Sequence, residues 1–244
     1  MRQSPLFSNI ETGEVVYDNV ECATYKGITV KTCILLIIAA LIASFTAFAL
    51  PSILVNNFGV FYITLAISSI VGFISVIVGR TSERKAKYAS VIYAVCEGLF
   101  LGSLSAIAEA FVPGVVTVAI FATIAIFSVM LILFATGVIK VGSKLRSIAF
   151  GLTIGALALI LMTFILQFFI DYSTYLGIII VVEAFLLFYG IITLSFNFAE
   201  ASSVVQRGAS KDAEWSVSLG LLVSIIYIYV EVVRLIVLLA ARRD

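Results

Sequence analysis

Ionisable side chains that lie inside long apolar stretches are the first candidates for chemistry in this 244-residue chain. Glu97, Glu183, Glu231 and Arg234 each occupy such a position. A charged side chain at membrane depth is costly, and it almost always faces protein or a water-filled cavity instead of lipid. We therefore expect these four residues to face the interior of the protein.

Two helical stripes of small and polar residues accompany these charges. At about 100° per residue, six residues of the last apolar stretch share one face: Ser216, Gly220, Ser224, Tyr227, Glu231 and Arg234. The preceding stretch carries a similar face: Glu183, Gly190, Thr193, Asn197 and Glu200. Two such faces in contact predict a hydrated path. Carboxylate and amide oxygens suit a hard cation such as calcium, and clustered acids in a low dielectric share protons.

The same residues also fit a purely structural interpretation. Glu231 and Arg234 are three residues apart on one helix, so they can neutralise each other. Glu183 can be a second partner of Arg234 or a protonated, hydrogen-bonded side chain. Gly98 and Gly102, close to Glu97, have the spacing of a helix-packing contact.

Composition places the chain in the class of integral membrane proteins. It is 62% hydrophobic and only 12% charged, with a mean hydropathy of +1.21. The absence of histidine excludes imidazole chemistry, and three scattered cysteines support neither a disulfide framework nor a zinc site. We expect no enzyme activity, no cofactor, no certain metal centre and no nucleic-acid partner. Calcium is considered only as a transported ion.

Seven apolar stretches are long enough to cross a bilayer. They lie at about 32–53, 58–79, 88–108, 115–138, 147–170, 174–198 and 216–240. Residues 1–30 are more polar and are predicted to form a cytoplasmic tail, followed by one transmembrane domain over 31–244. The predicted fold is an all-α, polytopic, seven-transmembrane-helix bundle whose last helix is central.

Basic residues predict the orientation of this bundle in the membrane. They precede the first stretch and fill alternate loops: Arg2, Lys26, Lys31, Arg80, Arg84, Lys85, Lys87, Lys140, Lys144, Arg146, Arg207 and Lys211. By the positive-inside rule the N-terminus is cytoplasmic and the C-terminus lies outside, although Arg242 and Arg243 run against this rule. The expected location is the plasma membrane of a bacterium, with the lipid bilayer as the main partner.

Several segments resemble a known family. Tyr93–Gly102 (YAVCEGLFLG), Arg207–Ala209 followed by Glu214 and Trp215, and the closing pair Gly220–Val223 and Ile228–Leu235 are similar to the bacterial branch of the Bax-inhibitor, or transmembrane Bax inhibitor motif, family. The resemblance extends over nearly the whole chain. It implies a bundle in which the last helix is enclosed by the other six.

The resemblance also implies a pH-sensitive calcium leak. In that family the leak is governed by one aspartate on each of the last two helices, with an arginine near the cytoplasmic end of the second helix. Arg80 fits the arginine. On the sixth helix this chain offers Asn197 and Glu200 at the expected place, and no aspartate.

The position of the last-helix acid has two readings. Ile228–Val230 is similar to the Leu-Tyr-Leu pattern that precedes the family's aspartate, which makes Glu231 the candidate. Counting onward from Trp215 instead places the family's acid near Ser224, two turns earlier.

Two functional hypotheses follow. The first is a pH-sensitive calcium leak channel with Glu231 and either Glu200 or Asn197 on its path. Arg80 and Arg234 then supply supporting charge, and Glu183 and Glu97 are further acids on the path. The alternative is an interaction protein that regulates other membrane proteins or a membrane protease through residues 1–30. Proton-coupled transport is less favoured, because the chain has no internal repeat and no helix broken in mid-span.

Overall fold

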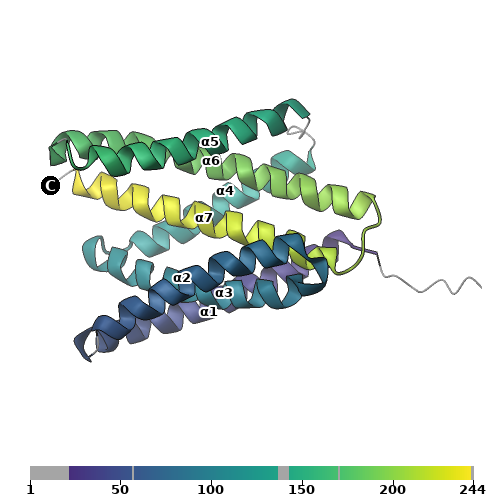
Figure 1. The fold of residues 1–244 in the computed structure, drawn as a ribbon, viewed down its shortest axis with the longest axis horizontal. Coiled ribbons are helices and arrows are strands. Elements are labelled where there is room, and N and C mark those ends of the chain that lie inside the picture. The colour runs from purple at the N-terminus through teal and green to yellow at the C-terminus, as the bar shows by residue number, and fades with distance from the viewer. Residues whose placement is uncertain (1–21, 57, 137–142, 170, 243–244) are drawn as a thin grey trace, which may run out of the picture.

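The computed structural model describes residues 22–56, 58–136, 143–169 and 171–242 (Figure 1). These residues form seven α-helices and no β-sheet, so the prediction of an all-α chain is confirmed. The helices are α1 (Tyr25–Asn56), α2 (Phe58–Thr81), α3 (Glu83–Phe111), α4 (Val115–Ala135), α5 (Ser143–Leu166), α6 (Tyr172–Gln206) and α7 (Ala213–Ala241).

Six of these helices are long and apolar enough to cross a membrane: α1, α2, α3, α4, α6 and α7. In α5 the part with described side chains, Gly151–Leu166, is a shorter apolar helix. Large hydrophobic side chains such as Phe45, Phe73 and Phe121 are exposed on the outside of the bundle, as a protein in lipid requires. The structure is that of a polytopic helical membrane protein, and a seventh crossing by α5 stays a prediction.

Helix α7 lies in the middle of the molecule (Figure 1). It packs against α1, α2, α3, α4 and α6, whereas α5 packs against α6 alone among the described residues. The expected enclosure of the last helix by all six others is therefore wrong for α5. The part of α5 with described side chains, Gly151–Leu166, is apolar, so lipid can cover the faces that α6 leaves open.

The boundary between the predicted tail and the first helix also differs from the expectation. Residues 1–21 lie outside the described part of the chain, but α1 already begins at Tyr25, inside the predicted tail of residues 1–30. The early start has a local cause, because the Thr24 hydroxyl accepts a hydrogen bond of 3.0 Å from the Gly27 amide, as a helix cap does. Lys31 therefore belongs to α1 and does not precede the first helix.

Close packing of α3 on α1 explains two of the glycines. A side chain at Gly98 or Gly102 would run into the backbone of α1 at Ala39 or Ala43. The packing interpretation of this glycine pair is confirmed, and it brings α3 close enough to α1 for both helices to support α7.

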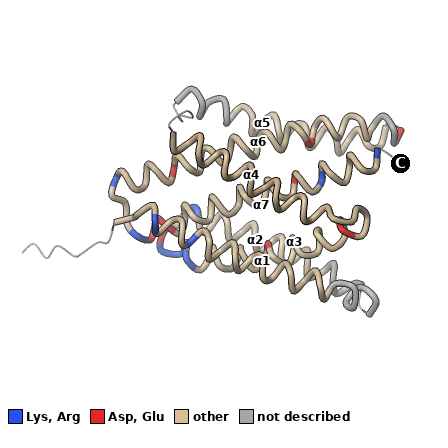
Figure 2. The backbone as a smooth tube through the Cα atoms, turned by 180° about the vertical axis from the view of Figure 1, so that it is seen from behind, with Lys and Arg blue, Asp and Glu red and all other residues tan. Residues whose placement is uncertain are grey.

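Most lysine and arginine residues lie at one end of the bundle, which we call the basic end (Figure 2). The start of α1 and the α2–α3 and α6–α7 connections lie there, with Lys31, Arg80, Arg84, Lys85, Lys87, Arg207 and Lys211. The α3–α4 turn and the end of α7 lie at the opposite end (Figure 1). A path along α7 would therefore run from the basic end to the opposite end.

Candidate functional site: a polar seam between α6 and α7

The two polar stripes predicted from helical periodicity meet where α6 packs against α7. We call this contact the polar seam, and it contains two groups of side chains. The amide cluster, nearer the basic end, comprises Arg80, Asn197, Glu200, Ser216 and Ser224. The acidic cluster, nearer the opposite end, comprises Glu183, Tyr227, Glu231 and Arg234.

The amide cluster is held by short hydrogen bonds. The amide nitrogen of Asn197 donates to the hydroxyl of Ser224 at 2.6 Å, and both side chains are buried. Arg80 reaches in from α2, where its Nη2 lies 2.8 Å from Oε2 of Glu200 and its Nη1 donates to the Ser216 carbonyl at 3.2 Å. These bonds join α2, α6 and α7 at one point.

The absence of a side chain at Gly220 allows Asn197 and Arg80 to pack closely against α7. A Cβ at position 220 would lie 2.8 Å from Oδ1 of Asn197 and 2.9 Å from Nη1 of Arg80. Ser224, one turn further on, contacts Asn197, whereas Glu231 is about 10 Å further along the helix. The sequence left two positions open on the last helix, Glu231 and Ser224. In the structure it is Ser224 that contacts Asn197.

The acidic cluster is more loosely paired. Glu183 and Glu231 are buried, at 7% and 2% exposure, and lie side by side. Nη1 of Arg234 lies 3.9 Å from Oε1 of each carboxylate, beyond the usual limit of about 3.2 Å for a hydrogen bond. Oε2 of each acid has no hydrogen-bond partner among the described residues. The predicted meeting of Glu183 and Glu231 across the last two helices is what the structure shows.

The charges of the acidic cluster do not balance. Two buried carboxyl groups share one guanidinium, and the Arg234 side chain is itself 50% exposed. The structural interpretation, in which Arg234 pairs with both acids, is therefore correct in its geometry, but one acid is left without a counter-charge. Removing such groups from water is costly unless they are fully paired. A contribution to the stability of the fold therefore does not explain why these acids are buried here.

Apolar side chains separate the two clusters. Leu194 of α6 and Ile228 of α7 are fully buried between them. The ring of Tyr227 lies against Gly190, and its hydroxyl donates to the Leu186 carbonyl at 3.3 Å. The seam is therefore polar at two levels and closed between them in this structure.

Glu97 does not join either cluster. It is half-buried on α3, next to Tyr93 and Cys96, and no described hydrogen bond or ion pair links it to the seam. Helix α3 instead presents Leu101 and Ser105 to α7, where the Ser105 hydroxyl is 2.7 Å from that of Tyr229. Thus the fold brings together all the predicted site residues except Glu97, in two groups.

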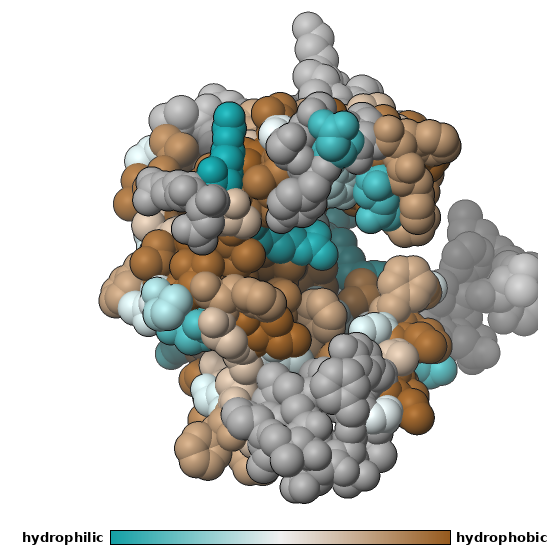
Figure 3. Space-filling model, turned by 90° about the vertical axis from the view of Figure 1, so that its left-hand side faces the viewer, coloured by the Kyte–Doolittle hydropathy of each residue, from teal (hydrophilic) through white to brown (hydrophobic). Residues whose placement is uncertain are grey.

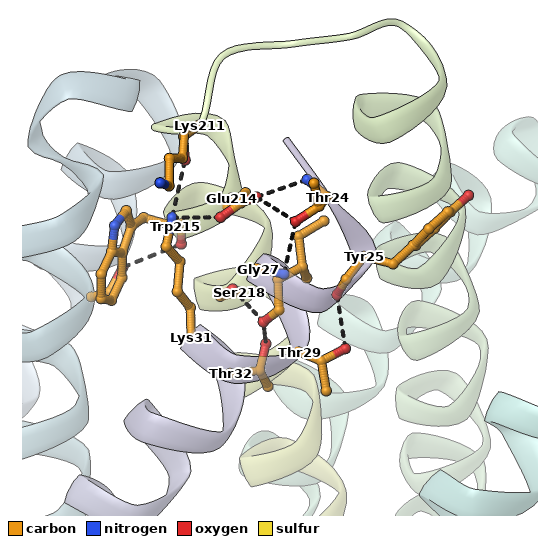
Figure 4. A network of polar contacts seen from close by, with 12 residues as sticks. Thr24, Tyr25, Gly27, Thr29, Lys31, Thr32, Lys211, Glu214, Trp215 and Ser218 are labelled. Carbon is orange, nitrogen blue, oxygen red and sulfur yellow. Dashed lines mark hydrogen bonds and ion pairs between the residues drawn. The ribbon is translucent and has the colours of Figure 1, made fainter. Parts of the chain in front are cut away.

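Sequence reasoning missed a further buried acid, Glu214, in the first turn of α7 (Figure 4). Its carboxylate lies 2.7 Å from Nζ of Lys31 and accepts hydrogen bonds from the amide and hydroxyl of Thr24 at 2.7 and 3.2 Å. Lys31 was interpreted only as a signal of orientation. The sequence did offer a signal for this ion pair: Lys31 lies in the first apolar helix, and Glu214 lies at the start of the last one.

Trp215 and Ser218 strengthen the same attachment (Figure 4). The Trp215 ring centroid lies 5.0 Å from Nζ of Lys31 and 6.0 Å from Nζ of Lys87, within the range of a cation–π contact. The Ser218 hydroxyl donates to the Ile28 carbonyl at 3.0 Å. The start of α7 is thereby fastened to α1 and α3, and the attachment positions the polar seam.

The chemistry available at the seam is that of oxygen atoms and fixed charges. Among the described residues, no three His, Cys, Asp or Glu side chains are grouped so that they could hold a metal ion. The acidic cluster offers two carboxyl groups, which can bind protons or contact a passing cation.

The fold and the seam define a multi-pass helical membrane protein with ionisable side chains buried between its last two helices. The model of one family, described as Bax inhibitor 1 like, matches residues 4–241. The chain therefore belongs to the Bax-inhibitor family, and the resemblance noted in the sequence is confirmed. No curated protein and no solved structure matched the chain.

Proposed function

We propose that this protein is a pH-sensitive, passive calcium leak of the bacterial plasma membrane, with the acidic cluster on the ion path. The observation that carries the proposal is the buried pair Glu183 and Glu231, which has one oxygen without a hydrogen-bond partner on each residue and only one arginine between them. Membership of the Bax-inhibitor family supports the proposal. An uncompensated acid in a membrane helix is a mark of an ion or proton pathway.

Calcium is the favoured ion because hard divalent cations prefer carboxylate oxygens. Two carboxyl groups are far fewer than the six to eight oxygens of a stable calcium site. Contact with a passing ion is therefore weak, and conduction requires binding that is weak enough for release. Protons compete with calcium for the same oxygens, so flux should fall as the solution becomes acidic.

The pH response is assigned to the acidic cluster because its two carboxyl groups are buried, whereas the one carboxylate of the amide cluster, Glu200, is more than a third exposed and lies 2.8 Å from Arg80. The family resemblance implied a pair of aspartates on the last two helices beside an arginine. Here the residues in contact beside Arg80 are Asn197 and Ser224, and neither side chain ionises near neutral pH. The buried carboxyl groups of the seam are Glu183 and Glu231.

Conduction requires a second conformation. Leu194 and Ile228 close the seam between the two clusters, so α6 and α7 must separate there for an ion to pass. Repulsion between two ionised, adjacent acids favours that separation, and protonation removes the repulsion. With the basic end in the cytoplasm, Arg80 and Glu200 stand at the inner mouth of this path.

The test is calcium flux into liposomes that contain the purified protein and a calcium-sensitive dye. The wild-type protein should raise flux above that of empty liposomes, and the increase should shrink from mildly alkaline to mildly acidic pH. Glu231→Gln should lose the pH response, whereas the exposed Glu83→Gln should retain it. Equal flux and equal pH response in wild type and Glu231→Gln would remove Glu231 from the mechanism.

Absence of wild-type flux would contradict the leak itself and favour the interaction protein. In that case the intact chain should co-purify other membrane proteins that a chain lacking residues 1–21 does not retain. This deletion leaves α1 and its attachment to Glu214 in place.

A further inference from the structure

A crevice of about 210 Å³ lies between α5, α6 and α7 toward the end of the molecule opposite the basic end. It forms where α5 packs against α6 without reaching α7. Its walls are apolar side chains of α5 and α6, among them Ile160, Phe164 and Leu186. Figure 3 looks onto this end and shows hydrophilic residues between hydrophobic groups. Thr163, Gln167 and Tyr175 add polar groups to these walls. A concave cavity that combines apolar walls with a small number of polar groups is the usual form of a small-molecule site.

The charged residues that line the crevice are Glu183 and Arg234. Glu183 is more than nine-tenths buried, and its Oε2 has no hydrogen-bond partner among the described residues. Its other oxygen lies 3.9 Å from Arg234, too far for a hydrogen bond. A buried carboxylate with so little pairing is unfavourable, so an N–H donor that reaches the Glu183 carboxylate from the crevice would stabilise it.

Charge decides which kind of ligand fits. Glu183 and Glu231 share Arg234, so this region already holds one carboxyl group more than its positive charges. An anionic head group would add a third negative charge, whereas an ammonium group would supply the missing counter-charge. A neutral alcohol would supply neither the charge nor the strength of a charge-assisted hydrogen bond.

We propose that this crevice is a binding site for a small hydrophobic amine, whose ammonium group pairs with Glu183 while its apolar body lies against α5 and α6. At roughly 30 Å³ for each non-hydrogen atom, the share that a water molecule takes in the liquid, the cavity holds about seven such atoms. Hexylamine has this size. The site does not depend on calcium transport, because it needs only the crevice and the carboxylate of Glu183.

The probes are hexylamine, hexanol and hexanoate, which share one apolar chain and differ in the charge of the head group. Binding is measured by ligand-observed NMR on the purified full-length protein in lipid nanodiscs, and the signal from empty nanodiscs is subtracted to remove partitioning into lipid. Hexylamine should bind saturably, and hexanol and hexanoate should bind about tenfold more weakly or less.

Two variants locate the site. Glu183→Gln should weaken hexylamine binding about tenfold or more, whereas Glu97→Gln, which alters a half-buried acid outside the crevice, should leave it unchanged. Ile160→Trp fills the crevice from the exposed face of α5 without touching either acid, and it should also abolish binding.

Three results would overturn the proposal: no saturable hexylamine binding, equal binding in wild type and Glu183→Gln, or tighter binding of hexanoate. The last result would assign the crevice to an anionic amphiphile held by Arg234. None of these readouts uses calcium, so a failure here is distinct from a failure of the proposed leak.

Discussion

Helix α7 carries two buried acids near its two ends, Glu214 and Glu231, and they differ sharply in their partners. Glu214 is 1% exposed and has a lysine at 2.7 Å and two hydrogen bonds from Thr24. Glu231 is 2% exposed, yet its ion pair with Arg234 spans 3.9 Å and is shared with Glu183. Burial alone therefore does not separate a structural acid from a functional one.

The difference between the two acids lies in what surrounds them. Glu214 faces the first turn of α1, whose amide groups and Lys31 offset the loss of water around the carboxylate. Glu231 faces another acid, Glu183, and shares its only cation with it. The fold gains an attachment from Glu214, whereas it bears a cost at Glu231 that stability does not explain. We assign that cost to function.

Replacing Glu214 should have the largest effect on stability. Glu214→Ala leaves Lys31 buried without its partner, so the free energy of unfolding should fall by about 3–5 kcal/mol. The measurement is equilibrium unfolding in detergent. The control is Glu83→Ala, an exposed acid that accepts a hydrogen bond of 3.0 Å from the Ser210 hydroxyl, for which a change within about 1 kcal/mol is expected. Equal stability of the two variants would show that Glu214 is not a structural acid.

A change beside Glu214 that leaves every charge in place should have the next largest effect. A Cβ at Gly27 would overlap the Glu214 carboxylate, so Gly27→Ala must displace Glu214 from Lys31 and Thr24. The expected loss is about 1–3 kcal/mol. Gly151→Ala, in α5 with nothing within 4 Å of the new Cβ, is the matched control and should lose no stability. A similar result for both glycines would mean that the geometry around Glu214 matters little.

Neutralising Glu231 should affect stability much less than neutralising Glu214. Glu231→Gln removes a carboxylate that lacks its own counter-charge, so the unfolding free energy should change by no more than about 1 kcal/mol, and an increase is allowed. Glu214→Gln, measured in the same detergent, should be the less stable of the two variants. The reverse order would contradict the distinction between the two acids.

The exposed ion pair at the basic end should contribute least. Glu200 and Arg80 are each more than a third exposed, so Glu200→Gln should change the unfolding free energy by about 0–1 kcal/mol. The small difference should shrink further at high ionic strength, because salt screens exposed charges. A loss of unfolding free energy as large as that of Glu214→Ala would mean that the ion pair between Arg80 and Glu200 stabilises the fold as much as the one between Lys31 and Glu214.

Helical periodicity was sufficient to predict the polar seam. The stripes on α6 and α7 follow from residue spacing alone, and counting residues along each helix placed Glu183 and Glu231 at a similar depth. Their contact required only that α6 and α7 be neighbours, and the short connection between these helices favours that arrangement. The all-α class followed from long apolar stretches in the same way.

Features that depend on how one helix is placed against another could not be predicted from spacing. The pairing of Lys31 with Glu214 joins residues from opposite ends of the chain. The choice of Ser224 as the partner of Asn197 depends on how far α6 slides along α7, which no periodicity determines. The separation of Glu97 from the seam depends on how α3 is rotated against α7, and the contact of α5 with α6 alone depends on packing that the spacing of its residues does not determine.

The most direct test of the account compares the two clusters of the polar seam in one calcium-flux experiment. Liposomes containing the double variant Glu183→Gln/Glu231→Gln should lose most of the calcium flux and its dependence on pH. Liposomes containing Asn197→Ala/Ser224→Ala should keep the pH dependence, whatever their total flux. A pH response that persists without the two acids, or one that disappears with Asn197 and Ser224, would contradict the assignment of the ion path to the acidic cluster.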